Sequence, residues 1–154
     1  MKKILIAVDD TKSARVIFEK CMGLCKCMAP EEIALVYVEQ FAGKSLLDDM
    51  ILDSELETLK EVLEGTEYKE ALDAKAEKVL NHYKAAVELN AAGASVKTIV
   101  RTGHPAEQIL QTAQEEGSDI IFIGSMGKRP PRMMMGSVSR EVANSAEVPV
   151  LVMR

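Results

Sequence analysis

Two apolar patterns alternate along the chain and predict alternating strands and helices. Short, nearly continuous apolar runs predict buried strands at residues 2–8, 32–38, 95–101, 119–123 and 149–153. Segments with apolar residues at helical spacing predict helices at residues 11–28, around 54–63, 67–90, 105–116 and 137–146. Pro105 at the first turn of one helix and Gly117 after its end agree with these bounds.

Two of the predicted helices carry a single apolar face that we expect to pack on the sheet. In helix 11–28 this face includes Cys21, Leu24 and Cys25, while Cys27 falls outside it and is expected to be an exposed thiol. In helix 67–90 the apolar stripe consists of Tyr68, Leu72, Ala76, Val79, Tyr83 and Val87. The two cysteines on the first face are therefore predicted to be core residues.

The order of the elements predicts the fold class. Strands that alternate with helices of this length form a parallel sheet with right-handed crossovers and helices on both faces. We therefore predict an α/β fold, a single-domain, doubly wound, five-stranded parallel sheet spanning residues 1–154. Residues 39–65 are the least regular part and are interpreted as a variable, insertion-like segment.

Composition and charge exclude some functions. The net charge is −5 and aromatic residues make up 4% of the chain, which argues against a nucleic-acid-binding surface. The charge is uneven, however, because residues 39–90 hold 13 acidic and 6 basic side chains whereas residues 124–154 hold 2 acidic and 5 basic. A small anion could therefore still bind near the C-terminal end.

No segment is long enough to span a membrane. The first apolar run, from Ile4 to Val8, has five residues, against about 20 for a transmembrane helix. The three cysteines lie within seven positions of one another, which favours reduced thiols over a disulfide framework. We therefore expect a cytoplasmic protein that does not contact membranes.

Candidate binding residues follow two of the predicted strands. The first strand ends at Asp9, and the fourth leads into a loop with Gly124, Gly127 and Gly136-Ser137. Open α/β sheets bind ligands beyond the carboxyl ends of their strands, and glycines followed by a helix N-terminus suit an anion. The loop also carries Lys128 and Arg129. By spacing alone, a plain connecting loop remains an equal alternative, and Asp9 could simply cap a helix.

Four stretches of the chain together resemble one known family. These are KKILIAVDDTKSA, TGHPAEQIL, SDIIFIGSMG and GSVSREVANSAEVPVLVMR, and the similarity covers nearly all of residues 1–154. They resemble the universal stress proteins, which have a doubly wound α/β fold of the adenine nucleotide alpha hydrolase type. The nucleotide-binding branch of that family carries G-x2-G-x9-G-[S/T]. In this chain eight residues, not nine, separate Gly127 from Gly136, and two of them are Pro130 and Pro131.

The resemblance implies a site for ATP, with or without Mg2+. Asp9 would approach the ribose or a phosphate-bound metal, and the end of the second strand would contact the adenine edge. The glycines and the start of the last helix would contact the phosphates. The implied binding residues are Ala7, Asp9, Val38, Gly124, Met126, Gly127, Lys128, Arg129, Gly136, Ser137 and Val138.

Three functions remain open from the sequence. The resemblance favours an ATP-binding, homodimeric stress-response regulator whose subunits join through the last strand, an apolar run from Val148 to Met153. The alternatives are a nucleotide-free dimeric scaffold, because the phosphate loop is short, and a weak ATP hydrolase. No nucleophile–base pair is recognisable, and Asp9 is the single candidate for hydrolysis. His104, before Pro105, is either a turn residue or a contact at the rim of the site.

Overall fold

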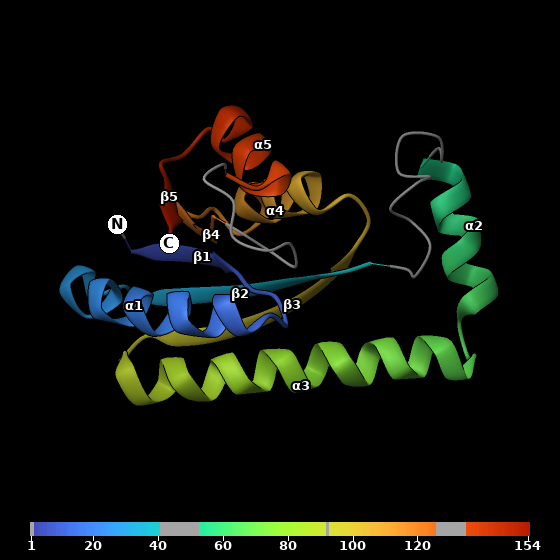
Figure 1. Cartoon of the computed structure of the whole chain (residues 1–154), viewed down its shortest axis with the longest axis horizontal. Helices are drawn as coiled ribbons and strands as arrows, with labels where there is room; N and C mark the ends of the chain where they lie inside the picture. Colours follow the sequence, from blue (N-terminus) through green and yellow to red (C-terminus); the bar gives the residue numbers. More distant parts are fainter. Residues whose placement is uncertain (1, 41–52, 92, 126–134) are drawn as a thin grey trace.

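The strands and helices follow the order that the apolar pattern predicts (Figure 1). The computed structural model describes residues 2–40, 53–91, 93–125 and 135–154. The strands are β1 (Lys3–Ala7), β2 (Glu32–Glu39), β3 (Ser95–Thr102), β4 (Ile120–Gly124) and β5 (Val150–Met153). The helices are α1 (Lys12–Met28), α2 (Asp53–Leu63), α3 (Glu67–Asn90), α4 (Pro105–Glu115) and α5 (Ser137–Ser145).

The five strands form one parallel sheet in the order β3-β2-β1-β4-β5. The chain first builds outward from β1 through β2 to β3, then crosses back and adds β4 and β5 on the other side of β1. At the end of β1, Ala7 pairs with Val36 of β2 on one side and with Ile123 of β4 on the other. The predicted doubly wound, five-stranded parallel sheet is therefore confirmed.

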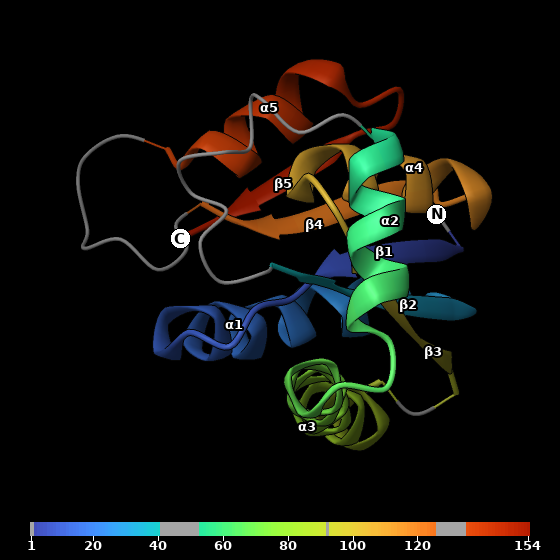
Figure 2. The ribbon, with the colours of Figure 1, turned by 90° about the vertical axis from the view of Figure 1, so that its right-hand side faces the viewer.

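Each face of the sheet is covered by two helices, which gives two apolar cores. Helices α1 and α3 cover one face, and α4 and α5 cover the other (Figures 1 and 2). Alternate residues of each strand enter opposite cores, so Ile4 and Ile6 face α1 and α3 while Leu5 faces α4 and α5. This sandwich fixes where each strand ends, and those ends carry the candidate site.

The buried face of α1 is rotated from the one that the sequence predicts. Leu24 is 47% exposed, whereas Met22 is 3% exposed and belongs to the core. The face centres on Cys21 and Cys25, which are buried as predicted, and Leu24 lies about 90° around the helix from that centre. Burial raises the pKa of the Cys21 thiol to about 12 and that of Cys25 to about 11, so both stay protonated. Cys27 is exposed, as predicted.

The start of α3 extends beyond the sheet that it covers (Figure 1). The helix has 24 residues and is about 36 Å long, whereas β2 and β3, with 8 residues each, span about 26 Å. Tyr68, in the first turn of α3, is 38% exposed, so its predicted place on the buried stripe is wrong. Among the described residues, no helix is both long enough and apolar enough to cross the lipid bilayer.

Candidate functional site

The candidate site lies where the strand order reverses, at the carboxyl ends of β1 and β4. These two strands are neighbours in the sheet, yet β1 leads to one side of the sheet and β4 to the other. The connections after them therefore separate and leave a crevice, the usual binding position in open α/β sheets. Asp9 lies two residues beyond Ala7, and Ser125 lies two residues beyond Ile123, its partner across the strands.

The residues after β1 form a tight turn around the Asp9 carboxylate. Its Oδ1 accepts hydrogen bonds from the main-chain N–H of Thr11, at 2.8 Å, and from the Thr11 hydroxyl, at 2.7 Å. The Thr11 hydroxyl oxygen in turn accepts from the N–H of Ala14, at 3.1 Å, and caps α1. Thr11 rather than Asp9 is therefore the N-terminal cap of α1, and Asp9 orients that cap from outside the helix.

The two ends of the glycine-bearing loop are held together by one carbonyl group. The carbonyl oxygen of Ser125 accepts a hydrogen bond from the N–H of Gly136, at 2.8 Å, and another from the Ser139 hydroxyl, at 3.2 Å. The N–H of Ser125 donates to the carbonyl of Met153 in β5, at 2.7 Å. Gly124 and the start of α5, thirteen positions apart in the sequence, are thus brought to one place.

The first turn of α5 has the features of an anion site. Gly136 is its N-cap residue and has no side chain with which to accept from the free N–H groups, and the first turn contains no acidic residue. Ser137 is exposed and Val138 is half-buried. Beside this turn, the Ser125 hydroxyl is buried and has no hydrogen-bond partner in the described part of the chain. Uncapped N–H groups and an unpaired hydroxyl together suit a ligand with several acceptor oxygens.

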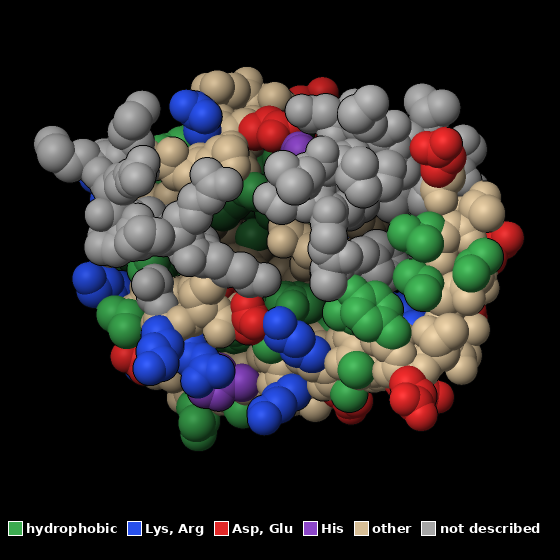
Figure 3. All heavy atoms as spheres, turned by 45° about the vertical axis from the view of Figure 1, so that its right-hand side comes forward, with side chains coloured by type: hydrophobic (Ala, Val, Ile, Leu, Met, Phe, Trp, Pro, Cys, Tyr) green, Lys and Arg blue, Asp and Glu red, His purple; other side chains and the backbone are tan. Residues whose placement is uncertain are grey.

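Three predicted site residues share the core beneath α4 and α5. Ala7, Val38 and Val138 are all partly buried and pack against that same apolar cluster. Figure 3 views the molecule obliquely from the side to which the strands point, and apolar side chains of the described residues are visible there below the outermost atoms. An apolar wall next to uncapped N–H groups suits a ligand with one apolar ring and one anionic end.

The remaining predicted site residues have mixed outcomes. Met126, Gly127, Lys128 and Arg129 lie outside the described residues, so their roles stay predictions, as do those of the two prolines that follow. His104 is the N-cap residue of α4 without a side-chain cap, and its Nδ1 lies 3.7 Å from Oε1 of Glu141 in α5. No group of three or more His, Cys, Asp or Glu side chains within the described ranges is arranged to hold a metal ion.

Comparison with known proteins identifies the family. The family model of the universal stress proteins matches residues 1–154. The universal stress protein MJ0577 of Methanocaldococcus jannaschii is 30% identical over 157 residues, which cover 99% of this chain and 94% of that protein. This chain belongs to the universal stress protein family.

Several solved universal stress proteins share this fold along nearly their whole length. The MJ0577 structure has a TM-score of 0.73 at 29% identity, with 99% of this chain and 94% of that chain covered. A universal stress protein of Archaeoglobus fulgidus, solved in complex with dAMP, has a TM-score of 0.60 at 18% identity, with 100% and 98% covered. A further universal stress protein, solved in complex with cAMP, has a TM-score of 0.64 at 14% identity, with 98% of this chain and 94% of that chain covered.

In this universal stress protein, the sequence did not reveal two serines that shape the site. Ser125 and Ser139 hold the ends of the loop together through a main-chain carbonyl. The glycines on either side of Ser125 indicate a ligand-binding loop in the sequence. Ser125 itself gives no such indication, because its role depends on α5, which begins twelve residues later.

Proposed function

We propose that this universal stress protein binds ATP at the carboxyl ends of β1 and β4 and acts as a homodimeric stress-response regulator. The observation that carries the proposal is the Ser125 carbonyl, which holds the N-terminus of α5 against the end of β4 at the point of strand reversal. Relatives of the same fold were solved with dAMP and with cAMP, which are adenine nucleotides. They support an adenine nucleotide as the ligand.

In the proposed complex each part of the site meets one part of the nucleotide. The N–H of Gly136 already donates to the Ser125 carbonyl, so its predicted role as a phosphate donor is wrong. The phosphates accept hydrogen bonds from the N–H groups of Ser137 and Val138. Gly124, Gly127, Gly136 and the cationic Lys128 and Arg129 surround the phosphates. The base packs on the apolar wall of Ala7 and Val38. The remaining implied contact, Met126, lines the ribose and phosphates.

Mg2+ fits this proposal without a dedicated protein cage. Mg2+ commonly binds through one or two carboxylates together with substrate phosphates and waters. Asp9 supplies one carboxylate at this edge of the sheet, and its Oδ1 is already engaged by Thr11. In the proposed complex, the ion would therefore be held mainly by the phosphates.

The proposed dimer uses β5, an edge strand. Among the described strands, β5 pairs with β4 alone, and all four of its residues are partly exposed. An apolar strand with an unpaired edge is a surface that a second copy of the chain can cover.

Release and titration of nucleotide test the proposed function. Denaturation of the purified protein should release an adenine nucleotide detectable by chromatography, and the stripped protein should bind Mg-ATP in a calorimetric titration. The Ser137→Asp variant should bind about tenfold more weakly or worse, because its carboxylate repels phosphate at the helix N-terminus. The same carboxylate favours the helix dipole, so the variant should keep or raise its thermal stability.

A control separates this effect from a general change of charge. Asn81→Asp adds one negative charge on the exposed side of α3, which covers the other face of the sheet, and should leave ATP affinity unchanged. If nothing is released and the stripped protein does not bind ATP at millimolar concentration, the nucleotide-free scaffold replaces the proposed function.

A further inference from the structure

A buried tyrosine of α3 makes a hydrogen bond to the turn that contains Asp9. The Tyr83 hydroxyl donates a hydrogen bond to the main-chain carbonyl oxygen of Asp9, at 2.9 Å. The two residues lie 74 positions apart in the sequence. The side chain of Tyr83 comes from the face of the sheet opposite to the apolar wall of the candidate site, so it contacts the turn without entering the site.

Tyr83 is a rigid donor. It is 2% exposed, and its ring packs on Phe18 of α1 with 4.6 Å between the ring centroids and 59° between the planes. Burial, together with the nearby negative charge of Asp9, raises the pKa of Tyr83 to about 12. The hydroxyl therefore remains protonated near neutral pH and keeps its hydrogen bond to the carbonyl.

A second contact from the same helix reaches the next residue of the turn. The Nζ of Lys75, eight residues before Tyr83, lies 2.6 Å from Oδ2 of Asp10. The Lys75 side chain is 45% exposed and that of Asp10 is 25% exposed. Consecutive residues of the turn are thus tied to α3, one through its main chain and one through its side chain.

These contacts leave one oxygen of Asp9 for a ligand. Oδ1 accepts both hydrogen bonds from Thr11. Oδ2 accepts none from the described part of the chain. An ionised carboxylate only accepts hydrogen bonds, so it attracts hydroxyl donors and repels phosphate oxygens. Within a nucleotide, the hydroxyl donors are those of the ribose.

We propose that Tyr83 is a positioning residue, which holds the Asp9 turn so that the Asp9 carboxylate accepts hydrogen bonds from the ribose hydroxyl groups of the bound nucleotide. This inference rests on the proposed function and adds to it a buried residue, on the far face of the sheet, that sets nucleotide affinity.

A pair of nucleotides distinguishes this role from a structural one. Tyr83→Phe removes only the hydroxyl and keeps the ring that packs on Phe18. Calorimetric titration should show about three- to tenfold weaker binding of Mg-ATP, which corresponds to the loss of one hydrogen bond's net contribution. Binding of Mg-2′,3′-dideoxy-ATP, which lacks the ribose hydroxyls, should be the same for wild type and variant.

Two further variants complete the experiment. Tyr68→Phe makes the same chemical change on the same helix, fifteen residues and roughly 22 Å away, and should leave both nucleotides' affinities unchanged. Lys75→Gln should weaken ATP binding less than Tyr83→Phe does, because its pair with Asp10 is partly exposed, and should also spare the dideoxy nucleotide. All titrations are made well below each variant's melting temperature.

The outcomes separate this inference from the function on which it rests. Equal losses for the two nucleotides would show that Tyr83 acts through overall folding or through metal-bound phosphate, and would overturn the inference. Unchanged ATP binding by Tyr83→Phe would overturn it as well, while the proposed function stands. A wild-type protein that binds neither nucleotide defeats the proposed function, and the inference with it.

Discussion

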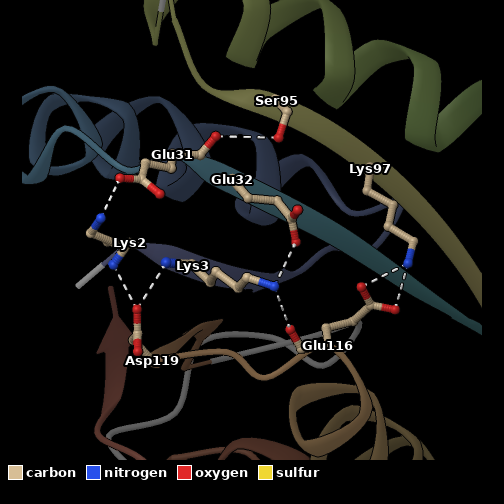
Figure 4. A network of polar contacts seen from close by, with 8 residues as sticks. All are labelled: Lys2, Lys3, Glu31, Glu32, Ser95, Lys97, Glu116 and Asp119. Atoms are coloured by element: carbon tan, nitrogen blue, oxygen red, sulfur yellow. Dashed lines mark hydrogen bonds and ion pairs between the residues drawn. The ribbon is translucent and has the colours of Figure 1, made fainter.

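At the scale of single residues, Asp119 shows how a surface carboxylate can join distant parts of the chain. It precedes β4, and its Oδ2 accepts hydrogen bonds from the main-chain N–H groups of Lys2, at 2.6 Å, and Lys3, at 2.9 Å (Figure 4). Because these bonds favour the ionised form, they hold the pKa of Asp119 below its ordinary value. These hydrogen bonds hold the start of β1 beside the start of β4, at the amino ends of the strands, whereas the candidate site lies at their carboxyl ends.

The lowered pKa gives Asp119 a pH-dependent effect on stability. A carboxyl whose pKa is lower in the folded state stabilises the fold above its unfolded pKa, about 3.9, and loses that effect as the pH falls through the folded value. Asp119→Asn should therefore lower the urea midpoint at pH 7 and match wild type at the acid end of the folded range. Glu77→Gln, an exposed change on α3, serves as the control. A deficit of constant size across the pH range would assign the effect to geometry instead of charge.

Sequence patterns identify a residue's role when that role depends on local position. Asp9 was predicted because an acid directly after a buried strand lies at the carboxyl edge of a parallel sheet. Tyr83 was recognised only as part of an apolar stripe, because its hydroxyl bonds to a carbonyl 74 positions away. Ser125 was not predicted as a site residue for the same reason, because its carbonyl accepts a hydrogen bond from Gly136, the N-cap of a helix that begins twelve residues later.

At the scale of elements, two threonines begin the two helices on one face. Thr11 caps α1, and Thr66 caps α3 through a hydrogen bond from the N–H of Lys69, at 3.3 Å. The two caps are chemically alike, but Thr11 also donates to the carboxylate of Asp9. They therefore form a natural pair in which one member touches the candidate site and the other does not.

Alanine at each cap should separate stability from binding. Thr11→Ala and Thr66→Ala should each lower the free energy of unfolding by about 1 kcal/mol, measured by urea denaturation, because each loses a capping bond. Mg-ATP affinity should fall for Thr11→Ala and stay at the wild-type value for Thr66→Ala. Equal affinities in the two variants would mean that the start of α1 does not support the ligand.

The bounds of every element lie within one residue of their prediction, because apolar spacing and flanking Pro or Gly are local signals. Which face of a helix is exposed depends less on local sequence, because it is set by the elements that pack against the helix. Leu24 fits the helical spacing of α1, yet the sheet and α3 contact a face centred elsewhere. Tyr68 fits the stripe of α3, yet it is exposed, because α3 is longer than the strands β2 and β3 of the described sheet.

At the scale of the whole molecule, the sheet has two different edges. At one edge, β3 carries exposed polar residues and two ion pairs, Lys97 with Glu116 and Arg101 with Glu115. At the other, β5 has four apolar residues that are all partly exposed. Charged side chains protect an edge from pairing, whereas an apolar edge invites it. The two edges therefore predict different behaviour in solution.

One lysine at each edge tests the proposed dimer. Val152→Lys on β5 should convert a dimer to a monomer in sedimentation velocity, because its charge would be desolvated in the interface. Val100→Lys makes the same change on β3, where the valine is 43% exposed, and should leave the dimer intact. If only the β3 variant dissociated into monomers, the dimer interface would lie at β3 and not at β5.

The alternation of strands and helices predicted the doubly wound sheet, and the four motif stretches predicted the family. The residue pattern did not supply the strand order β3-β2-β1-β4-β5, because hydrophobic spacing carries no information on which strands are neighbours. The positions of Met126 to Arg129 stay a prediction, since they lie outside the described residues.

Because all five strands run in one direction, Lys2 lies at the end of the sheet where the strands begin, and Arg154 lies at the end where they finish. Lys2 precedes β1 and donates its N–H to Asp119. Arg154 follows Met153, which pairs with Gly124 at the carboxyl end of β4, beside the candidate site. The choice of attachment point therefore matters when the protein is fixed to a biosensor surface. Anchoring near Lys2 leaves the crevice facing the solution, and anchoring at Arg154 brings the support up against it.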